Sequence, residues 1–161
     1  MKKETPDKDV SKAMDKIMII GVGSSGYNIA STIRQEATAD VFKNAKYVIA
    51  DTDKSLYDFI VEEGKEEDYT FIDLMDIDLD NDIPSDFFQN IEKVYIVAGM
   101  GGRTGTKWVP IISQYAKRKG FESVTAIVSL PFGFEGKKKM DIARDAVAKI
   151  SDSKIDRLIT I

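Results

Sequence analysis

The strongest constraint on the fold is a regular alternation of short apolar runs with segments of helical periodicity. The predicted strands cover residues 17–20, 46–53, 93–99, 124–130 and 157–161, and the predicted helices cover 26–37, 55–62, 108–119 and 140–150. Strands separated by helices need crossover connections, which are right-handed and produce parallel pairing. The sequence therefore predicts an α/β fold with three layers: a Rossmann-like open sheet, mostly parallel, with helices on both faces.

Composition excludes several classes of function. The chain contains neither histidine nor cysteine, which excludes disulfides, thiol chemistry, Cys/His zinc sites and a histidine base. A net charge of −4 gives no electrostatic case for nucleic acid, and no apolar stretch is long enough for membrane insertion. The 161 residues suit one cytoplasmic domain over 16–161, after a polar lead-in at 1–15 that has no signal-peptide character.

One segment is strongly acidic: residues 62–86 contain eleven acidic residues and a single base, Lys65. A calcium loop is one interpretation, but Asn81 and Phe87 stand where an EF-hand needs glycine and a bidentate glutamate. We therefore interpret the segment as a solvated acidic connection with one strand or turn near 69–74.

The first predicted strand leads into a glycine loop, Gly21-x-Gly23-x-x-Gly26, which opens the next helix. In a doubly wound sheet, ligands bind outside the carboxyl ends of the strands, and a helix N-terminus offers N–H groups to a phosphate. Asp51 follows the second strand, close to the position of the ribose-binding acid in dinucleotide-binding proteins. By itself, this loop fits either a dinucleotide or a tight turn without a ligand.

A second glycine loop follows the strand at 93–99, and residues 99–106 hold four glycines and two threonines. Backbone N–H groups and threonine hydroxyls of such a loop can surround phosphate oxygens. The Gly-Lys-Ser/Thr ending of a Walker loop is absent. Pro110 is expected near the start of the following helix, where N–H groups have no partner within the helix and a proline therefore costs little stability. Two such loops on adjacent strands fit a di- or triphosphate tail better than one pyrophosphate bridge.

Together, these motifs resemble those of the FtsZ/tubulin family over most of the chain. GGRTGTK (101–107) is similar to the family's GGGTGTG signature, and FtsZ proteins share the preceding AGM. IGVGSSGYN (20–28) resembles the first FtsZ loop, and ADTD (50–53) is similar to the family's VNTD. SLPFGFEGKKKM (129–140) resembles KPFxFEGxxRM, and IDRLITI resembles the strand that follows. The chain thus resembles the N-terminal nucleotide-binding domain of FtsZ-like proteins.

The resemblance implies a ligand, an assembly and a set of site residues. The family binds GTP or GDP, with any Mg²⁺ held through the phosphates, and stacks head to tail into filaments of bacterial cell division or the cytoskeleton. The expected partners are nucleotide, a second copy of the chain or an FtsZ-type filament. Glu135 matches the family's ribose-contacting glutamate, and Lys139 stands where the family has an arginine near the phosphates; an exposed i,i+4 pair is the alternative.

The two loops and the resemblance together predict the nucleotide-binding residues, and they predict neither a catalytic residue nor a metal held by the protein. The predicted residues are Gly21, Gly23, Ser24, Ser25, Gly26, Asn28, Asp51, Gly99, Gly101, Gly102, Arg103, Thr104, Gly105, Thr106, Glu135 and Lys139.

At the expected site, the sequence also departs from the family pattern. Ser24 and Ser25 replace glycines, and Tyr27 adds bulk that is expected to narrow the cavity. Asp51 places a carboxylate where the family has asparagine, close to an anionic ligand.

Further departures concern the phosphate loop and the catalytic parts. Arg103 and Lys107 replace glycines, and they act either as added phosphate ligands or as side chains that fill the site. The family's sensor loop has no counterpart between Leu56 and Lys93, and the sequence ends at Ile161, before the family's central helix. The resemblance therefore implies weak or absent hydrolysis by this chain alone. The alternatives are a nucleotide-independent module that binds FtsZ-type filaments or itself, and an NAD-binding Rossmann protein.

Overall fold

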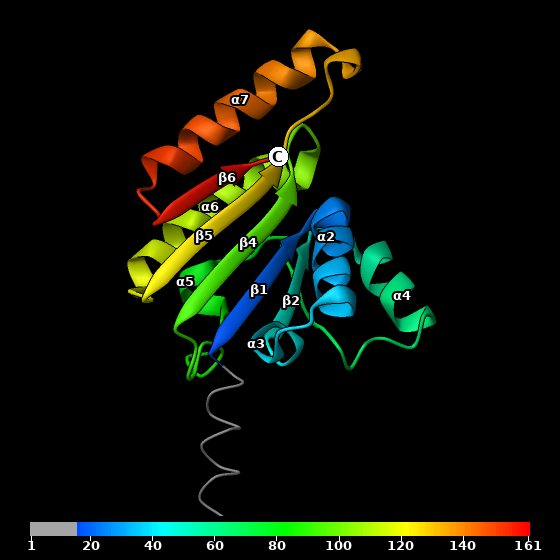
Figure 1. Ribbon diagram of the computed structural model, residues 1–161, viewed down its shortest axis with the longest axis vertical. Coiled ribbons are helices and arrows are strands. Elements are labelled where there is room, and N and C mark those ends of the chain that lie inside the picture. The colour runs from blue at the N-terminus through cyan, green and yellow to red at the C-terminus, as the bar shows by residue number, and fades with distance from the viewer. Residues whose placement is uncertain (1–15) are drawn as a thin grey trace, which may run out of the picture.

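The computed structural model describes residues 16–161, so the predicted polar lead-in at 1–15 lies outside the described residues. A six-stranded sheet in the order β3-β2-β1-β4-β5-β6 forms the middle layer (Figure 1). Its strands are β1 (Ile17–Val22), β2 (Lys46–Asp51), β3 (Thr70–Asp73), β4 (Lys93–Gly99), β5 (Ser123–Ser129) and β6 (Arg157–Thr160). All five strand pairs are parallel, which confirms the predicted three-layer α/β fold.

Helices cover both faces of this sheet. They are α2 (Gly23–Glu36), α3 (Asp40–Lys43), α4 (Lys54–Glu62), α5 (Leu79–Asp82), α6 (Arg103–Lys119) and α7 (Lys137–Asp152), and a 3₁₀ turn, η1 (Gly133–Glu135), precedes α7. None of the helices within residues 16–161 is both long and apolar enough to cross a membrane.

The order of the strands determines where a ligand can bind. The chain begins in the middle of the sheet at β1, adds β2 and β3 towards one edge, and then returns to add β4, β5 and β6 towards the other. Because every crossover is right-handed, the helices of the two halves lie on opposite faces. The connections that follow the adjacent strands β1 and β4 therefore diverge, and a crevice opens between them at the carboxyl ends of the strands.

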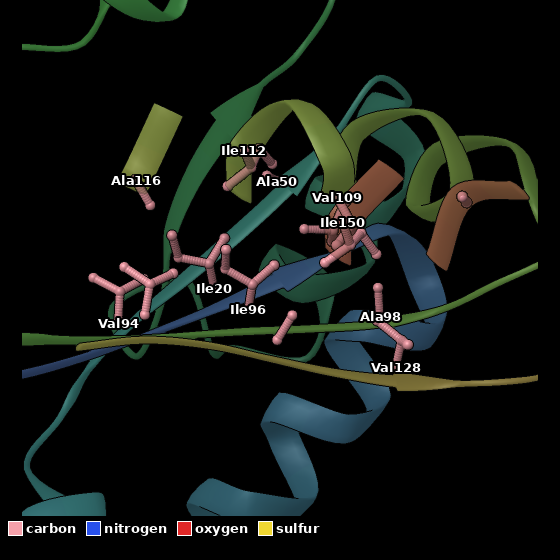
Figure 2. Close-up of a cluster of buried hydrophobic side chains, with 14 of the residues drawn as sticks. Ile20, Ala50, Val94, Ile96, Ala98, Val109, Ile112, Ala116, Val128 and Ile150 are labelled. Atoms are coloured by element: carbon pink, nitrogen blue, oxygen red, sulfur yellow. The ribbon is translucent and has the colours of Figure 1, made fainter. Parts of the chain in front are cut away.

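The central strands are apolar along their whole length because both faces of the sheet are covered. Side chains of alternate residues enter two separate cores. Met18, Ile20 and Val22 face the core beneath α6, which Figure 2 shows with Val109 and Ile112 from that helix. The other face packs against α2 and α4 and contains most of the buried aromatic rings.

Both helices that follow the glycine loops begin earlier than predicted, at Gly23 and Arg103. Much of each predicted loop is therefore the first turn of a helix. The expected place of Pro110 was wrong: Pro110 is the eighth residue of α6, beyond the first turn, where its missing N–H leaves the Thr106 carbonyl without the usual helical donor. The predicted helix end is confirmed, since α6 stops at Gly120 in the left-handed conformation.

The acidic segment contains more structure than a solvated connection. The strand expected near 69–74 is β3, at the edge of the sheet. Helix α5 was not predicted. Asp78 caps it by accepting hydrogen bonds from the Asp80 amide (3.1 Å) and from the Asn81 side chain (2.7 Å). The bond from Asn81 is the main reason why the pKa of Asp78 lies below its usual value.

Candidate functional site

A cleft of about 330 Å³ opens where β1, β2 and β4 end, at the reversal of strand order. This is the edge of the sheet at which the two glycine loops were expected to meet. Nine predicted site residues line the cleft: Gly23, Ser24, Ser25, Asp51, Gly99, Gly102, Arg103, Thr104 and Gly105. Val22, Thr52 and Asp53 also line it and were not among the predicted residues, although Thr52 and Asp53 belong to the ADTD motif.

Four of the predicted glycines serve close packing of helices on the sheet. A Cβ on Gly26 would lie 2.6 Å from the Val97 carbonyl oxygen, and a Cβ on Gly21 would lie 2.6 Å from the Gly26 carbonyl oxygen. A Cβ on Gly105 would clash with the Gly99 carbonyl oxygen, and a Cβ on Gly99 would lie 2.9 Å from Ser25 Cβ. These contacts allow α2 and α6 to begin directly against β1 and β4.

The other three glycines shape the loops. Gly23 and Gly101 have φ angles of +75° and +94°, a conformation that side-chain-bearing residues rarely adopt. Gly102 has an ordinary φ of −86° and no atom within 4 Å of where its Cβ would be. Of the predicted site glycines, only Gly102 is thus both open and part of the cleft wall.

Asp51, on the floor of the cleft, joins the connection after β2 to the second glycine loop. Asp51 is only 4% exposed. Its Oδ1 accepts hydrogen bonds from the amides of Thr52 (2.7 Å) and Asp53 (3.2 Å). The Thr104 hydroxyl donates a third bond to the same oxygen at 3.2 Å. In the second loop, the Thr106 hydroxyl accepts from the Gly101 amide at 2.8 Å. Both predicted threonine donors therefore also hold the loops together.

Three helices begin around this cleft, and their N-termini differ. Asp53 caps α4 by accepting from the Ser55 amide at 2.9 Å, and this bond is the main cause of the lowered pKa of Asp53. No side chain of the described residues caps α2 or α6. The first N–H groups of α2 and α6 are thus left to other acceptors.

Several predicted residues lie away from the cleft wall. Asn28 is exposed on α2, where its carbonyl accepts from the Thr32 hydroxyl at 2.9 Å. Gly101, Thr106 and Lys107 line a neighbouring groove between α6 and α7. Gly21 and Gly26 are buried in the packing described above.

The expected narrowing of the cavity by Tyr27 was wrong. Tyr27 is 5% exposed and points into the core beneath α2, where its ring contacts the rings of Phe59 and Tyr69 edge to face. Its aromatic neighbours, on α4 and just before β3, account for this orientation, since burial of the ring there removes it from water.

Glu135 and Lys139 form the i,i+4 pair that was the alternative to a nucleotide contact. Lys139 Nζ lies 3.0 Å from Glu135 Oε1, and neither residue belongs to the cleft wall. The stem of Lys139 nevertheless lies against the second loop, because a Cβ on Gly101 would be 3.1 Å from Lys139 Cγ.

The Glu135 carboxylate holds its own loop, and its titration provides a test. The Phe132 amide donates to Glu135 Oε2 at 2.6 Å, and this bond, followed by the one from Lys139, lowers the pKa of Glu135. A lowered folded-state pKa means that the contribution to stability is complete above the unfolded pKa and is lost as the pH falls through the folded one. In an NMR titration, the Phe132 amide should follow a midpoint below the ordinary glutamate value, and Glu135→Gln should abolish that step. A midpoint at or above the ordinary value would contradict the bond.

Within residues 16–161, no group of three or more carboxylates is arranged to hold a metal ion. The cleft offers backbone N–H groups, the hydroxyls of Ser24 and Ser25 and the Arg103 guanidinium, beside two carboxylates, the buried Asp51 and the exposed Asp53 that caps α4. This set of groups suits an anion that is small enough to enter between two helix N-termini.

Comparison with known proteins finds a resemblance that includes part of this site. Residues 84–161 match the GTPase domain of the Tubulin/FtsZ family. The cell division protein FtsZ of Pseudomonas aeruginosa is 44% identical over 77 residues, which cover 48% of this chain and 19% of that protein. The FtsZ of Buchnera aphidicola subsp. Schizaphis graminum is 47% identical over 70 residues, which cover 44% of this chain and 18% of that protein. The chain thus spans about a fifth of the length of these curated relatives.

Similarity of fold extends over nearly all of the chain. A TubZ from Clostridium botulinum phage c-st superposes with a TM-score of 0.67 and 17% identity, over 89% of this chain and 50% of that one. A CetZ2 of Haloferax volcanii, solved as a GTPγS-bound protofilament, gives a TM-score of 0.62 and 17% identity, over 91% and 48%. The family match covers the second glycine loop and everything after it, and the fold match extends over about nine tenths of the chain. The chain thus resembles the Tubulin/FtsZ family in sequence over residues 84–161 and in fold over nearly its whole length.

Proposed function

We propose that the cleft binds the phosphates of GTP or GDP. The observation that carries this proposal is the pair of uncapped helix N-termini at the cleft, those of α2 and α6, beside a third helix that is capped by its own Asp53. Uncapped N–H groups and the positive end of the helix dipole favour an anion, and two of them converge here.

The residues present fit a phosphate tail. Gly102 leaves an open place on the wall, and the exposed Ser24 and Ser25 add hydroxyl donors. Arg103 stands in the first turn of α6, where a cation is unfavourable unless an anion lies beside it. When bound, Mg²⁺ would offset the charge of the phosphates and of Asp51, and it would be held through the phosphates.

We further propose that hydrolysis by this chain alone is slow and that the chain acts in the cytoplasm within a filament-forming protein. Asp51 Oδ1 already accepts three hydrogen bonds, so this oxygen is a poor base for activating water. The names of the relatives support the assembly: one is a cell division protein, and one was solved as a protofilament.

Calorimetric titration of the full chain with GTP, GDP and ATP, each with Mg²⁺, tests the proposed ligand. We expect both guanine nucleotides to bind, with ATP as the comparison for base preference. Absence of heat at millimolar concentrations of all three would overturn the proposal.

Asp51→Asn provides a sharper prediction, because it removes a negative charge and keeps an oxygen that accepts from Thr52 and Asp53. Without Mg²⁺, the affinity for GTP should rise about tenfold, since a like charge at roughly 10 Å costs about 1–2 kcal/mol at an effective dielectric near 20. The gain should shrink when Mg²⁺ is present. Asp58→Asn, at an exposed position on α4, makes the same charge change outside the cleft and should leave the affinity unchanged. An equal gain in both variants would contradict a local effect of Asp51.

One observation favours a second candidate, a module that binds a protein without nucleotide. Glu135 and Lys139, which match the family's nucleotide-contacting positions, pair with each other, and the buried Asp51 opposes an anion. Under this candidate, calorimetry would show no nucleotide binding, and the chain would sediment together with FtsZ polymers.

A further inference from the structure

Charge is strongly segregated along this chain. Residues 62–86 contain eleven acids and one base, whereas residues 103–161 contain twelve bases and six acids. Within residues 16–161, most of these charges have no ion-pair partner: only Asp68, Asp80 and Glu135 of the acids and only Arg118 and Lys139 of the bases form ion pairs. The chain therefore carries two surfaces of opposite and largely unneutralised charge.

The basic surface includes a groove of about 610 Å³ between α6 and α7. Its charged lining residues are all basic: Arg103, Lys107 and Lys149. Its apolar lining includes Ile111 and Ile142, which are 39% and 42% exposed, and Pro110. An occupant of this groove would match it by carrying acidic groups beside an apolar side chain.

The acidic surface carries that combination. After β3, the segment Met75–Asp82 exposes four aspartates, at positions 76, 78, 80 and 82, and Met75 is the exposed apolar residue among them at 59%. Ile77 and Leu79 point the other way, into the core, which fixes the aspartates on the outside. We call residues 75–82 the acidic strip.

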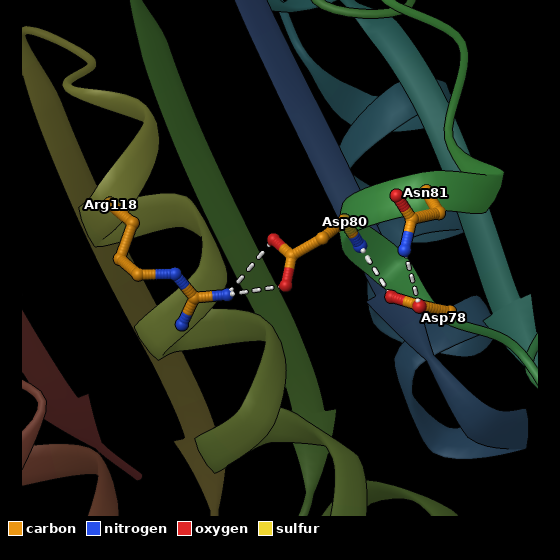
Figure 3. A network of polar contacts seen from close by, with 4 residues as sticks. All are labelled: Asp78, Asp80, Asn81 and Arg118. Atoms are coloured by element: carbon orange, nitrogen blue, oxygen red, sulfur yellow. Dashed lines mark hydrogen bonds and ion pairs between the residues drawn. The ribbon is translucent and has the colours of Figure 1, made fainter.

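A contact of this kind already exists inside the chain. Asp80 of the acidic strip meets Arg118 near the end of α6, with both carboxylate oxygens within 3.4 Å of one guanidinium nitrogen, and Asp78 holds Asn81 beside it (Figure 3). That contact lies near the C-terminal end of α6, whereas Arg103 and Lys107 line the groove near the start of the same helix, at least about 16 Å away along its axis.

We propose that the acidic strip of one copy docks into the α6–α7 groove of a second copy. The strip follows the edge strand β3, and α7 leads to the opposite edge strand β6, so the two surfaces lie towards opposite edges of the sheet. A contact between two different surfaces of identical chains is heterologous, and it repeats from copy to copy. The contact is side by side with respect to the strands, and of the three basic residues that line the groove only Arg103 also lines the cleft.

Sedimentation velocity of the full chain tests this contact. At about 50 mM salt, the sedimentation coefficient should rise with protein concentration, and at about 500 mM salt the rise should be lost, because charges in water are screened over a few ångströms at that ionic strength. Lys107→Glu with Lys149→Glu reverses charge in the groove, and Met75→Lys with Asp76→Asn changes charge in the acidic strip. Asn is chosen because residue 76 has a φ of +56°, which asparagine tolerates. Each double variant should lose self-association at low salt.

Sedimentation of a mixture of the two double variants is the decisive measurement. The groove variant keeps an unaltered strip and the strip variant keeps an unaltered groove, so the mixture should form dimers through this pair although neither variant associates alone. Lys43→Glu with Lys54→Glu, on exposed positions of α3 and α4, is the control with the same charge change as the groove variant, and it should associate like the unmodified chain. A chain that stays monomeric at low salt, or a mixture that fails to associate, would overturn the proposal. Calorimetry with nucleotide reports separately on the cleft.

Discussion

Gly26→Ala is expected to destabilise the fold by about 3 kcal/mol or more, a cost typical of severe overpacking. The added Cβ would lie 2.6 Å from the Val97 carbonyl oxygen and 2.8 Å from the Gly21 carbonyl carbon. Both neighbours are backbone atoms of central strands, so neither can move aside without shifting the sheet. We expect a lower midpoint in urea denaturation of the full chain, followed by circular dichroism.

Gly102→Ala is the matched control for this change. It introduces the same methyl group at the start of α6, where nothing lies within 4 Å and φ is −86°. The free energy of unfolding should change by less than about 0.5 kcal/mol, as is usual for a surface position. Equal destabilisation by the two alanines would show that the packing of α2 against β1 is looser than the structure has it.

Gly102→Leu is expected to lower the affinity for GTP and GDP by at least about tenfold, equal to about 1.4 kcal/mol, without loss of stability. Gly102 lines the cleft, where nothing lies within 4 Å of its Cβ position, so a leucine there has room to take up space beside the proposed phosphates. Fluorescence titration with a labelled guanine nucleotide measures the affinity, and urea denaturation measures the stability.

Gly133→Leu makes the same substitution at another glycine with no atom within 4 Å of its Cβ, in η1 and outside the cleft wall. This variant should bind nucleotide as the unmodified chain does. Unchanged binding by Gly102→Leu would place the phosphates elsewhere. Equal losses in both variants would point to a general effect of an exposed leucine.

The sheet and its order of elements could be predicted because the signals are local. Apolar runs of strand length and helical spacing repeat along the chain, and right-handed crossovers leave few ways to connect them. The helix stop at Gly120 was also predictable from a short stretch of sequence, whereas near residues 69–74 the sequence left a strand and a turn as alternatives.

Other features depend on contacts between distant residues, and the sequence could not reveal them. The packing roles of Gly21, Gly26 and Gly105 could not be recognised, because a glycine needed for close packing looks the same in sequence as a glycine that approaches a phosphate. Tyr27 turns away from the cleft because Phe59 and Tyr69, from two later elements, form its pocket. Helix α5 is only one turn long and depends on the N-cap at Asp78. In the sequence, this aspartate could not be distinguished from the other acidic residues around it.

NMR mapping of backbone amides in the isotope-labelled full chain, as GDP and Mg²⁺ are added, tests the central claim most directly. If the two uncapped helix N-termini hold the phosphates, the largest shifts should fall on Gly23, Ser24, Ser25 and on Gly102–Thr104. The amides in the groove between α6 and α7, beyond the loop itself, should change little. Saturable binding with its largest shifts on Ile111, Ile142 and Lys149, or no shifts at millimolar GDP, would contradict the account.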